Sequence, residues 1–88
     1  MTPHWTPRAL ADIAEVTEYI RADNRAAADQ LIERVLDVVN DTLTAQPRIG
    51  KPGRVATTRE FVVHPSYILV YCIKDTSLDI LAFRHTAQ

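Results

Sequence analysis

The sequence contains a single cysteine among its 88 residues, which excludes an internal disulfide and a cysteine-rich zinc site. That residue, Cys72, lies in the apolar run Ile68–Ile73, which predicts a buried thiol that packs as a small hydrophobic side chain. The longest apolar runs are far shorter than the roughly 20 residues that cross a bilayer. No basic-then-apolar signal segment stands at the N-terminus. We therefore expect a soluble, cytoplasmic protein with no membrane partner.

Glycine is almost as scarce, because Gly50 and Gly53 are the only two in the chain. The sequence holds no glycine-rich phosphate loop, and the HExxH and GxSxG motifs are absent. His4, His64 and His85 do not have the spacing of metal ligands. We therefore expect neither a metal ion nor a cofactor.

Composition and length indicate one small folded domain, residues 1–88. The chain is 47% hydrophobic and 24% charged, as in ordinary globular proteins. A domain of this size buries only about 60% of the surface of its unfolded chain, so its stability alone is marginal. A binding partner could therefore matter to it.

The net charge of −1 hides an uneven distribution. Residues 7–46 hold four cations and eight anions, a net of −4, whereas residues 47–88 hold six cations and three anions, a net of +3. This asymmetry indicates either a charged partner on one side or an acidic helical surface that balances a basic sheet.

Hydrophobic periodicity predicts two helices in the first half of the chain. Thr6 is a capping hydroxyl, and Pro7 follows at the first helical position, where its missing N–H does no harm. Apolar residues then recur at three-to-four spacing until a helix end near Ala22. Asn24 caps a second helix that ends near Gln46, before a proline. The two segments predict a helical hairpin.

A glycine- and proline-containing loop, 47–53, separates these helices from three runs of β type. The runs are Arg59–His64, Tyr67–Ile73 and Leu78–Arg84. The short turns between them allow only antiparallel hairpins, and His4–Trp5 could add a short edge strand. We predict an α+β fold of order β-α-α-β-β-β, with the helical hairpin packed on a small antiparallel sheet of three to four strands.

Polar residues that could act on a phosphate fall in or beside the predicted sheet: Arg54, Arg59, Glu60, His64, Tyr71, Arg84 and His85. Cleavage of RNA by its own 2′-OH needs proton-transfer groups and cations over the phosphate. His85 could transfer the proton, and Arg84 or Arg54 could supply the charge. Tyr71 could position or stack a base. Because Arg84 and His85 are adjacent, a continuous strand would point them to opposite faces. An ordinary structural role is the alternative for each residue.

Several segments stand in a recognisable order. They are Trp5–Ile20, the second helix with its Pro-x-x-Gly loop, Gly53–Val55, Thr58–Glu60, Tyr67–Tyr71, Asp79–Leu81 and His85. This order resembles the RelE/ParE superfamily of bacterial toxins over nearly the whole chain. The resemblance implies the fold described above and a type II toxin–antitoxin module, in which a cognate antitoxin neutralises the toxin. RelE-like members cut mRNA in the ribosomal A site without a metal, whereas ParE-like members block DNA gyrase.

The resemblance also implies site residues. His85 falls where several nuclease members have a catalytic histidine, so the catalytic set of a nuclease would be His85, Arg59, Arg84 and Tyr71. Arg54, Arg59 and Arg84 fall at or near basic positions of the family, and we assign them to target binding.

Three positions depart from the nuclease pattern. Ile68 stands where some nucleases have arginine, Thr86 replaces an aromatic residue, and Lys51 alone remains of a lysine-rich loop. These departures favour the ParE-like branch, a toxin that arrests growth by contact with DNA gyrase. The alternatives are a ribosome-dependent mRNA endonuclease and a non-toxic relic that still binds an antitoxin.

Antitoxin binding is common to all three interpretations. Small helices and a small sheet leave apolar surface and strand edges exposed, and an antitoxin helix and extended segment would cover them. We assign this contact to Leu10, Ile13 and Tyr19 on the first predicted helix and to Phe61 on the first long strand.

Overall fold

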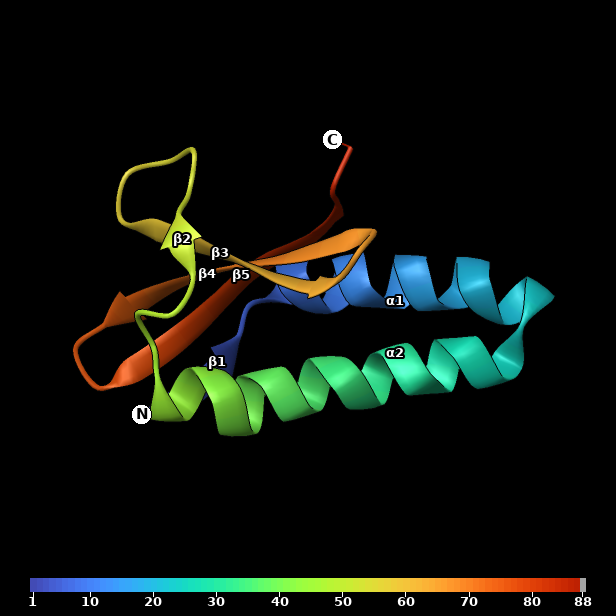
Figure 1. Ribbon diagram of the computed structural model, residues 1–88, viewed down its shortest axis with the longest axis horizontal. Coiled ribbons are helices and arrows are strands. Elements are labelled where there is room, and N and C mark those ends of the chain that lie inside the picture. The colour runs from blue at the N-terminus through green and yellow to red at the C-terminus, as the bar shows by residue number, and fades with distance from the viewer. Residues whose placement is uncertain (88) are drawn as a thin grey trace.

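Two helices lie side by side along one face of a five-stranded sheet, and the tip of their hairpin reaches beyond the strands (Figure 1). The computed structural model describes residues 1–87. Its elements are, in order, β1 (Thr2–Trp5), α1 (Pro7–Asp23), α2 (Arg25–Asp37), the π-helical segment η1 (Val38–Leu43), β2 (Lys51–Pro52), β3 (Thr58–His64), β4 (Tyr67–Lys74) and β5 (Ser77–His85). The predicted α+β class and helical hairpin are confirmed.

Both helices begin at the predicted caps. The Thr6 hydroxyl accepts a hydrogen bond from the Ala9 N–H at 3.2 Å. Asn24 donates its own N–H to the Ile20 carbonyl at the end of α1, and its side chain accepts from the Ala27 N–H at the start of α2. One residue therefore ends the first helix and caps the second, which makes the turn between them tight.

The second helix is less regular than predicted. The π-helical segment η1 follows α2 directly, and helical residues continue to position 45, close to the predicted end. A π-turn is wider than an α-turn and accommodates an extra residue. Val38, Val39 and Leu43 are all buried within it, so the wider turn keeps the last apolar side chains of the helix directed at the core.

The sheet has more strands than predicted and is mixed rather than wholly antiparallel. Its order is β1-β5-β4-β3-β2, in which β3, β4 and β5 form the predicted antiparallel meander. β1 is the anticipated edge strand, but it pairs parallel to β5, and the chain between the two supplies the long crossover that such pairing needs. β2 arises from residues predicted as loop, and Pro52 is tolerated there because β2 is an edge strand.

An irregularity in β5 decides which way the end of that strand faces. Its register with β4 skips Leu81, which forms a β-bulge. Ile80 before the bulge and Phe83 after it are therefore both buried. Beyond Phe83 the alternation continues, so Arg84 points to the outer face, the sheet face turned away from the helices. His85 points to the helix-facing side.

The core lies between the helices and one face of the sheet. Its fully buried members from β4 and β5 are Leu69, Tyr71, Leu78 and Ile80, and those from the helical half are Ala9, Ala28, Val35, Val38, Val39 and Leu43. The helices and the sheet therefore both contribute buried apolar side chains to one core.

Cys72 is only half-buried, so the prediction of a buried thiol is wrong. It follows the buried Tyr71 on β4 and therefore points to the outer face. Burial and the nearby Asp79 carboxylate raise the pKa of the Cys72 thiol, with Lys74 opposing them. The thiol therefore stays protonated near neutral pH, which makes it a poor nucleophile.

Candidate functional site

Arg59 and Tyr71 hold the loop that precedes β2. They are cross-strand neighbours on β3 and β4. The Tyr71 hydroxyl donates to the Pro47 carbonyl at 2.6 Å and accepts from the Gly50 N–H at 3.0 Å. The Arg59 guanidinium donates to the carbonyls of Gly50, at 2.7 Å, and Arg48, at 3.1 Å. Both side chains therefore bind loop backbone.

The space beneath this loop is filled. A Cβ atom at Gly50 would lie 2.6 Å from the Tyr71 hydroxyl oxygen and 2.9 Å from the Glu60 carbonyl oxygen, so only glycine fits. Burial raises the pKa of Tyr71, although the hydrogen bond from Gly50 and the charge of Arg59 lower it. The phenol is therefore neutral at physiological pH and already engaged as both donor and acceptor.

A groove on the outer face contains an ion pair between β3 and β5. The Arg84 guanidinium lies 2.9 Å from the Glu60 carboxylate, and both side chains are largely buried. Lys51 and Arg54 line the same groove, which has a volume of about 320 Å³. We call it the outer groove. Of the three cations predicted for target binding, it unites Arg54 and Arg84, while Arg59 holds the loop on the other side of the sheet.

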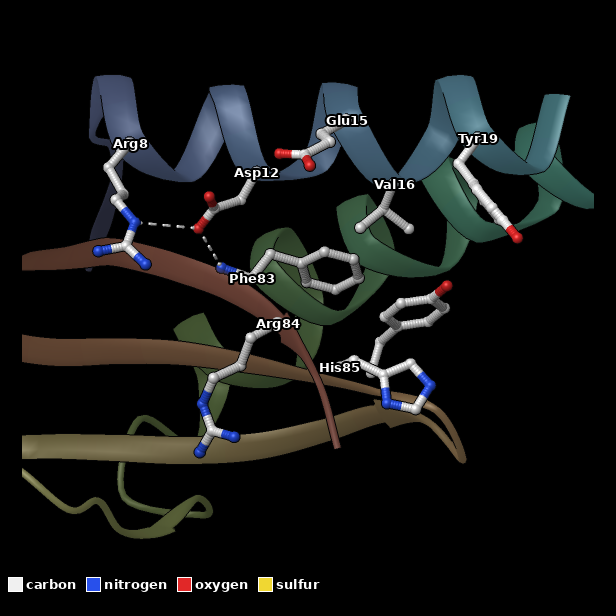
Figure 2. A pocket seen from close by; sticks show the side chains of 9 residues that line it. Arg8, Asp12, Glu15, Val16, Tyr19, Phe83, Arg84 and His85 are labelled. Atoms are coloured by element: carbon white, nitrogen blue, oxygen red, sulfur yellow. Dashed lines mark hydrogen bonds and ion pairs between the residues drawn. The ribbon is translucent and has the colours of Figure 1, made fainter. Parts of the chain in front are cut away.

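A cleft separates α1 from the end of β5 (Figure 2). The Asp12 carboxylate accepts a hydrogen bond from the Phe83 N–H at 3.1 Å and pairs with Arg8 at 3.4 Å. It thereby satisfies a backbone donor on a stretch of β5 that β1 does not reach. Figure 2 shows Tyr19 and His85 at the opposite end of the cleft from Arg8.

His85 belongs to a cluster of rings on the helix-facing side. Its imidazole packs edge-on against Tyr67, with 5.5 Å between ring centroids, and Tyr67 stacks on Phe83 at 5.3 Å. His64 contacts the same tyrosine at 5.7 Å. The Nδ1 atom of His85 accepts from the Ala87 N–H at 3.0 Å. The predicted catalytic histidine is therefore held in place by ring packing and a local hydrogen bond.

An apolar groove of about 170 Å³ runs between α1 and α2. We call it the helix groove, and its lining residues are Trp5, Leu10, Ile13, Ile32, Val35 and Leu36. Of the residues predicted to bind an antitoxin, Leu10 and Ile13 lie here. Tyr19, which is 76% exposed, lines the cleft beside β5 instead. Phe61 packs, half-buried, against the core. The predicted set thus spans three places.

The predicted catalytic residues do not meet at one point. Arg84 lies on the outer face, and the other three lie on the helix-facing side. His85 pairs with Tyr67, whereas Arg59 pairs with Tyr71, four residues further along β4. At the rise of a β-strand, this separation is about 13 Å. A single phosphate cannot contact all four side chains.

Two important contacts were missed from the sequence. Glu60 pairs with Arg84, and strand alternation was the available signal, since Glu60 precedes the inward-facing Phe61 and must face outward. The contact of Asp12 with Phe83 joins residues 71 positions apart. No periodicity reveals such a pair.

Among residues 1–87, no group of three or more His, Cys, Asp and Glu side chains could hold a metal ion. No helix in this part of the chain is long and apolar enough to cross a membrane.

Two relatives resemble the chain over most of its length. Toxin RelE2 of Caulobacter vibrioides is 37% identical over 84 residues, which cover 96% of this chain and 93% of the relative. A putative toxin of Sinorhizobium fredii, Y4kP, is 38% identical over 85 residues, which cover 96% and 86% of the two chains.

Solved structures share the fold at lower identity. A chain of the chromosomal ParDE toxin–antitoxin system from P. aeruginosa matches with a TM-score of 0.75 and 19% identity, over 97% of this chain and 95% of that one. A YoeB/ParE toxin from Agrobacterium tumefaciens gives a TM-score of 0.68 and 16% identity, over 97% and 98%. The family model of the ParE toxin of type II toxin–antitoxin system, parDE, matches residues 4–88. The chain therefore belongs to the ParE toxin family, within the RelE/ParE superfamily of type II toxin–antitoxin toxins.

Proposed function

We propose that this toxin arrests growth in the cytoplasm by inhibiting DNA gyrase through protein contact, and that a cognate antitoxin neutralises it. One observation carries the choice of gyrase over mRNA, namely that the residues expected to cleave RNA do not converge. General acid–base catalysis requires groups within about 3 Å of the reacting atoms. His85 lies far along the sheet from Arg59 and Tyr71, and Arg84 lies on the other face.

The charge of the outer groove supports the same choice. Arg84 faces the Glu60 carboxylate at 2.9 Å, so a carboxylate already compensates one of the few cations there. RNA binding gains affinity from each neutralised phosphate, which rewards many uncompensated cations. A protein partner needs fewer, because apolar contacts at an interface supply much of the affinity.

The helix groove is the proposed antitoxin site. Its lining is entirely apolar, and Leu10 and Leu36 at its rim are 55% and 45% exposed. An amphipathic helix recognises such a groove through apolar residues at i, i+3, i+4 and i+7. Burial of these side chains under an antitoxin helix would remove exposed apolar surface from a domain with a small core.

The test is induced expression without antitoxin, followed by a supercoiling assay with purified toxin and DNA gyrase. We expect growth arrest and loss of supercoiling at stoichiometric toxin. Supercoiling that survives this ratio would exclude gyrase as the target. Harmless expression would instead favour a relic that retains only antitoxin binding.

A ribosome-dependent mRNA endonuclease is the second candidate, and the outer groove is the observation that favours it. Lys51, Arg54, Glu60 and Arg84 all line the outer groove, which brings cations and a carboxylate together. The test is toxicity and mRNA cleavage of His85→Ala and Glu60→Gln. If both variants arrest growth like the wild type and no codon-linked cuts appear, this candidate is excluded.

A further inference from the structure

The cations of the chain are concentrated in one short segment. Between Asp41 and Glu60 the sequence contains no acidic residue and four cations, Arg48, Lys51, Arg54 and Arg59. Since the net charge of the whole chain is −1, the remaining residues carry a net of −5. The segment is therefore a local positive surface on an acidic protein, which attracts an acidic partner.

The same segment exposes apolar side chains. Ile49 is 47% exposed and Val55 is 69% exposed, although both are large hydrophobic residues. Aromatic residues are absent between Asp41 and Glu60. Proteins that grip single-stranded nucleic acid stack the bases on aromatic rings. Aliphatic side chains among cations are better suited to contact with a partner protein.

The tip of the β2–β3 hairpin is held in a strained conformation. Thr57 has φ 70, a left-handed conformation that β-branched residues disfavour. The next residue fixes it, because the N–H and hydroxyl of Thr58 donate to the Val55 carbonyl at 3.2 and 2.6 Å. The Gly53 N–H donates to the Thr58 carbonyl at 2.8 Å and closes the hairpin. Strain that the surrounding contacts maintain is common in preformed binding loops.

Two hollows flank this hairpin. Arg48 and Arg59 line one of about 340 Å³, and the outer groove with Lys51 and Arg54 lies on the other. Figure 1 shows the loop between β2 and β3 standing clear of the helices. Carboxylates of a partner can therefore approach both sides of the tip while Val55 contacts an apolar patch between them.

We propose that the segment Arg48–Thr58, the docking loop, is the preformed surface through which the toxin contacts an acidic region of its protein target, with Val55 as the apolar contact. This inference rests on the proposed function, which it deepens by naming the contact and the chemistry of the partner. Arg59 and Tyr71 act as positioning residues, because they hold the base of the docking loop from beneath.

The experiment compares Val55→Ser with Val62→Ser, a 52% exposed valine on β3 outside the docking loop. Arg54→Glu is compared with Arg25→Glu, an exposed cation on α2. Each variant is expressed without antitoxin, assayed for growth arrest and gyrase inhibition, and checked for folding by circular dichroism. We expect Val55→Ser and Arg54→Glu to inhibit gyrase only at concentrations at least about tenfold higher than the wild type. A change of this size corresponds to the loss of one buried valine side chain or of one charge pair at the interface. The two control variants should behave like the wild type.

The possible results separate the two proposals. If the wild type arrests growth but does not inhibit gyrase, gyrase is excluded as the target. The docking loop is then still tested by comparing growth arrest between its variants and their controls. Gyrase inhibition by Val55→Ser equal to that of Val62→Ser overturns the docking loop alone. Binding to a labelled single-stranded RNA that Arg54→Glu abolishes and Val55→Ser leaves intact identifies a nucleic-acid contact and also overturns it. A wild type that does not arrest growth overturns both proposals.

Discussion

Thr57 and Asp75 are the two non-glycine residues with positive φ within positions 1–87, at 70° and 53°. The two residues differ in the steric energy that this conformation costs. Asp tolerates the left-handed region because its short polar side chain can bond locally, whereas a β-branched threonine crowds its own backbone. Asp75 occupies the tight turn between β4 and β5, where such a residue is expected. Thr57 therefore marks the place where the chain stores strain.

Replacement of Thr57 by glycine should stabilise the protein. Glycine adopts positive φ without steric cost, and we expect the free energy of unfolding to rise by about 0.5–1 kcal/mol after the added freedom of the unfolded chain is subtracted. The melting temperature should rise by roughly 2–8 °C. Thermal unfolding measures the change, with Asp75→Gly as the control that should shift less. A Thr57→Gly protein that melts at or below the wild-type temperature would contradict this account.

Tyr71 should make the protein sensitive to alkaline pH. Its folded-state pKa is raised above the ordinary value of 10.0 by burial, so the folded state holds the phenolic proton more tightly than the unfolded state does. The resulting stability is fully present below about pH 10 and is lost as pH rises through the folded pKa. Tyr71→Phe should reduce this alkaline loss. It should also lower the free energy of unfolding at neutral pH by about 1–3 kcal/mol, since Pro47 and Gly50 lose their partner.

Urea unfolding between pH 7 and pH 11 measures both effects. Tyr19→Phe is the matched control, because this tyrosine is 76% exposed. It should leave the alkaline loss of stability unchanged. If Tyr71→Phe keeps the full wild-type dependence on pH, the loss arises elsewhere in the chain.

At the scale of elements, the helices protect the sheet edges where the short edge strands end. β1 pairs with β5 only as far as Ile80, and Asp12 from α1 occupies the Phe83 N–H beyond it. On the other side, Arg34 from α2 donates to the Val63 carbonyl at 3.2 Å, beyond the reach of β2. Unpaired strand edges promote association. Asp12 and Arg34 therefore cover the parts of the sheet edges that the short strands β1 and β2 leave unpaired.

Asp12→Ala should weaken this protection. Loss of a charge-assisted hydrogen bond to a partly buried N–H should lower the free energy of unfolding by about 1–3 kcal/mol. The uncovered edge should also increase self-association with concentration. Chemical denaturation and light scattering measure the two effects. Glu15→Ala, an exposed carboxylate on the same helix, is the control. Equal behaviour of the two variants would show that the contact with Phe83 has no protective role.

The whole molecule buries little apolar surface for the chain that it must order. The two helices reach beyond the sheet (Figure 1). The helix groove between them leaves Leu10 and Leu36 partly exposed. A domain of this length has little core with which to offset the entropy of folding. A partner that covers the helix groove would therefore contribute to the stability of the fold.

Leu10→Gln should change both antitoxin binding and the behaviour of the isolated chain. It removes apolar area at the rim of the helix groove, so we expect at least about tenfold weaker binding of the cognate antitoxin. We also expect a higher soluble yield without it. Val62→Gln, at a similarly exposed apolar residue on β3 outside the helix groove, is the comparison. Titration of the antitoxin against each variant measures affinity, and wild-type affinity in Leu10→Gln would place the antitoxin elsewhere.

Local signals were sufficient for the helices and the meander. Thr6, Asn24 and the apolar spacing acted within a few residues, and short turns left no choice but antiparallel pairing of β3, β4 and β5. The superfamily could also be recognised from the order of its segments. Parallel pairing of β1 with β5 could not be predicted in this way, because it joins residues distant in the chain. The strand made by Lys51–Pro52 and the bulge at Leu81 were also missed, because a two-residue strand and a single extra residue leave no periodic pattern in the sequence.

The candidate site shows the same division. The amino-acid sequence by itself determined which chemical groups were available, including His85, Arg59 and Tyr71. Only the tertiary structure decided that the last two hold a loop and that Arg84 faces Glu60. The physical reason is range, since caps and periodicity act between neighbours, whereas the direction of a side chain at the end of a strand depends on every bulge and pairing before it.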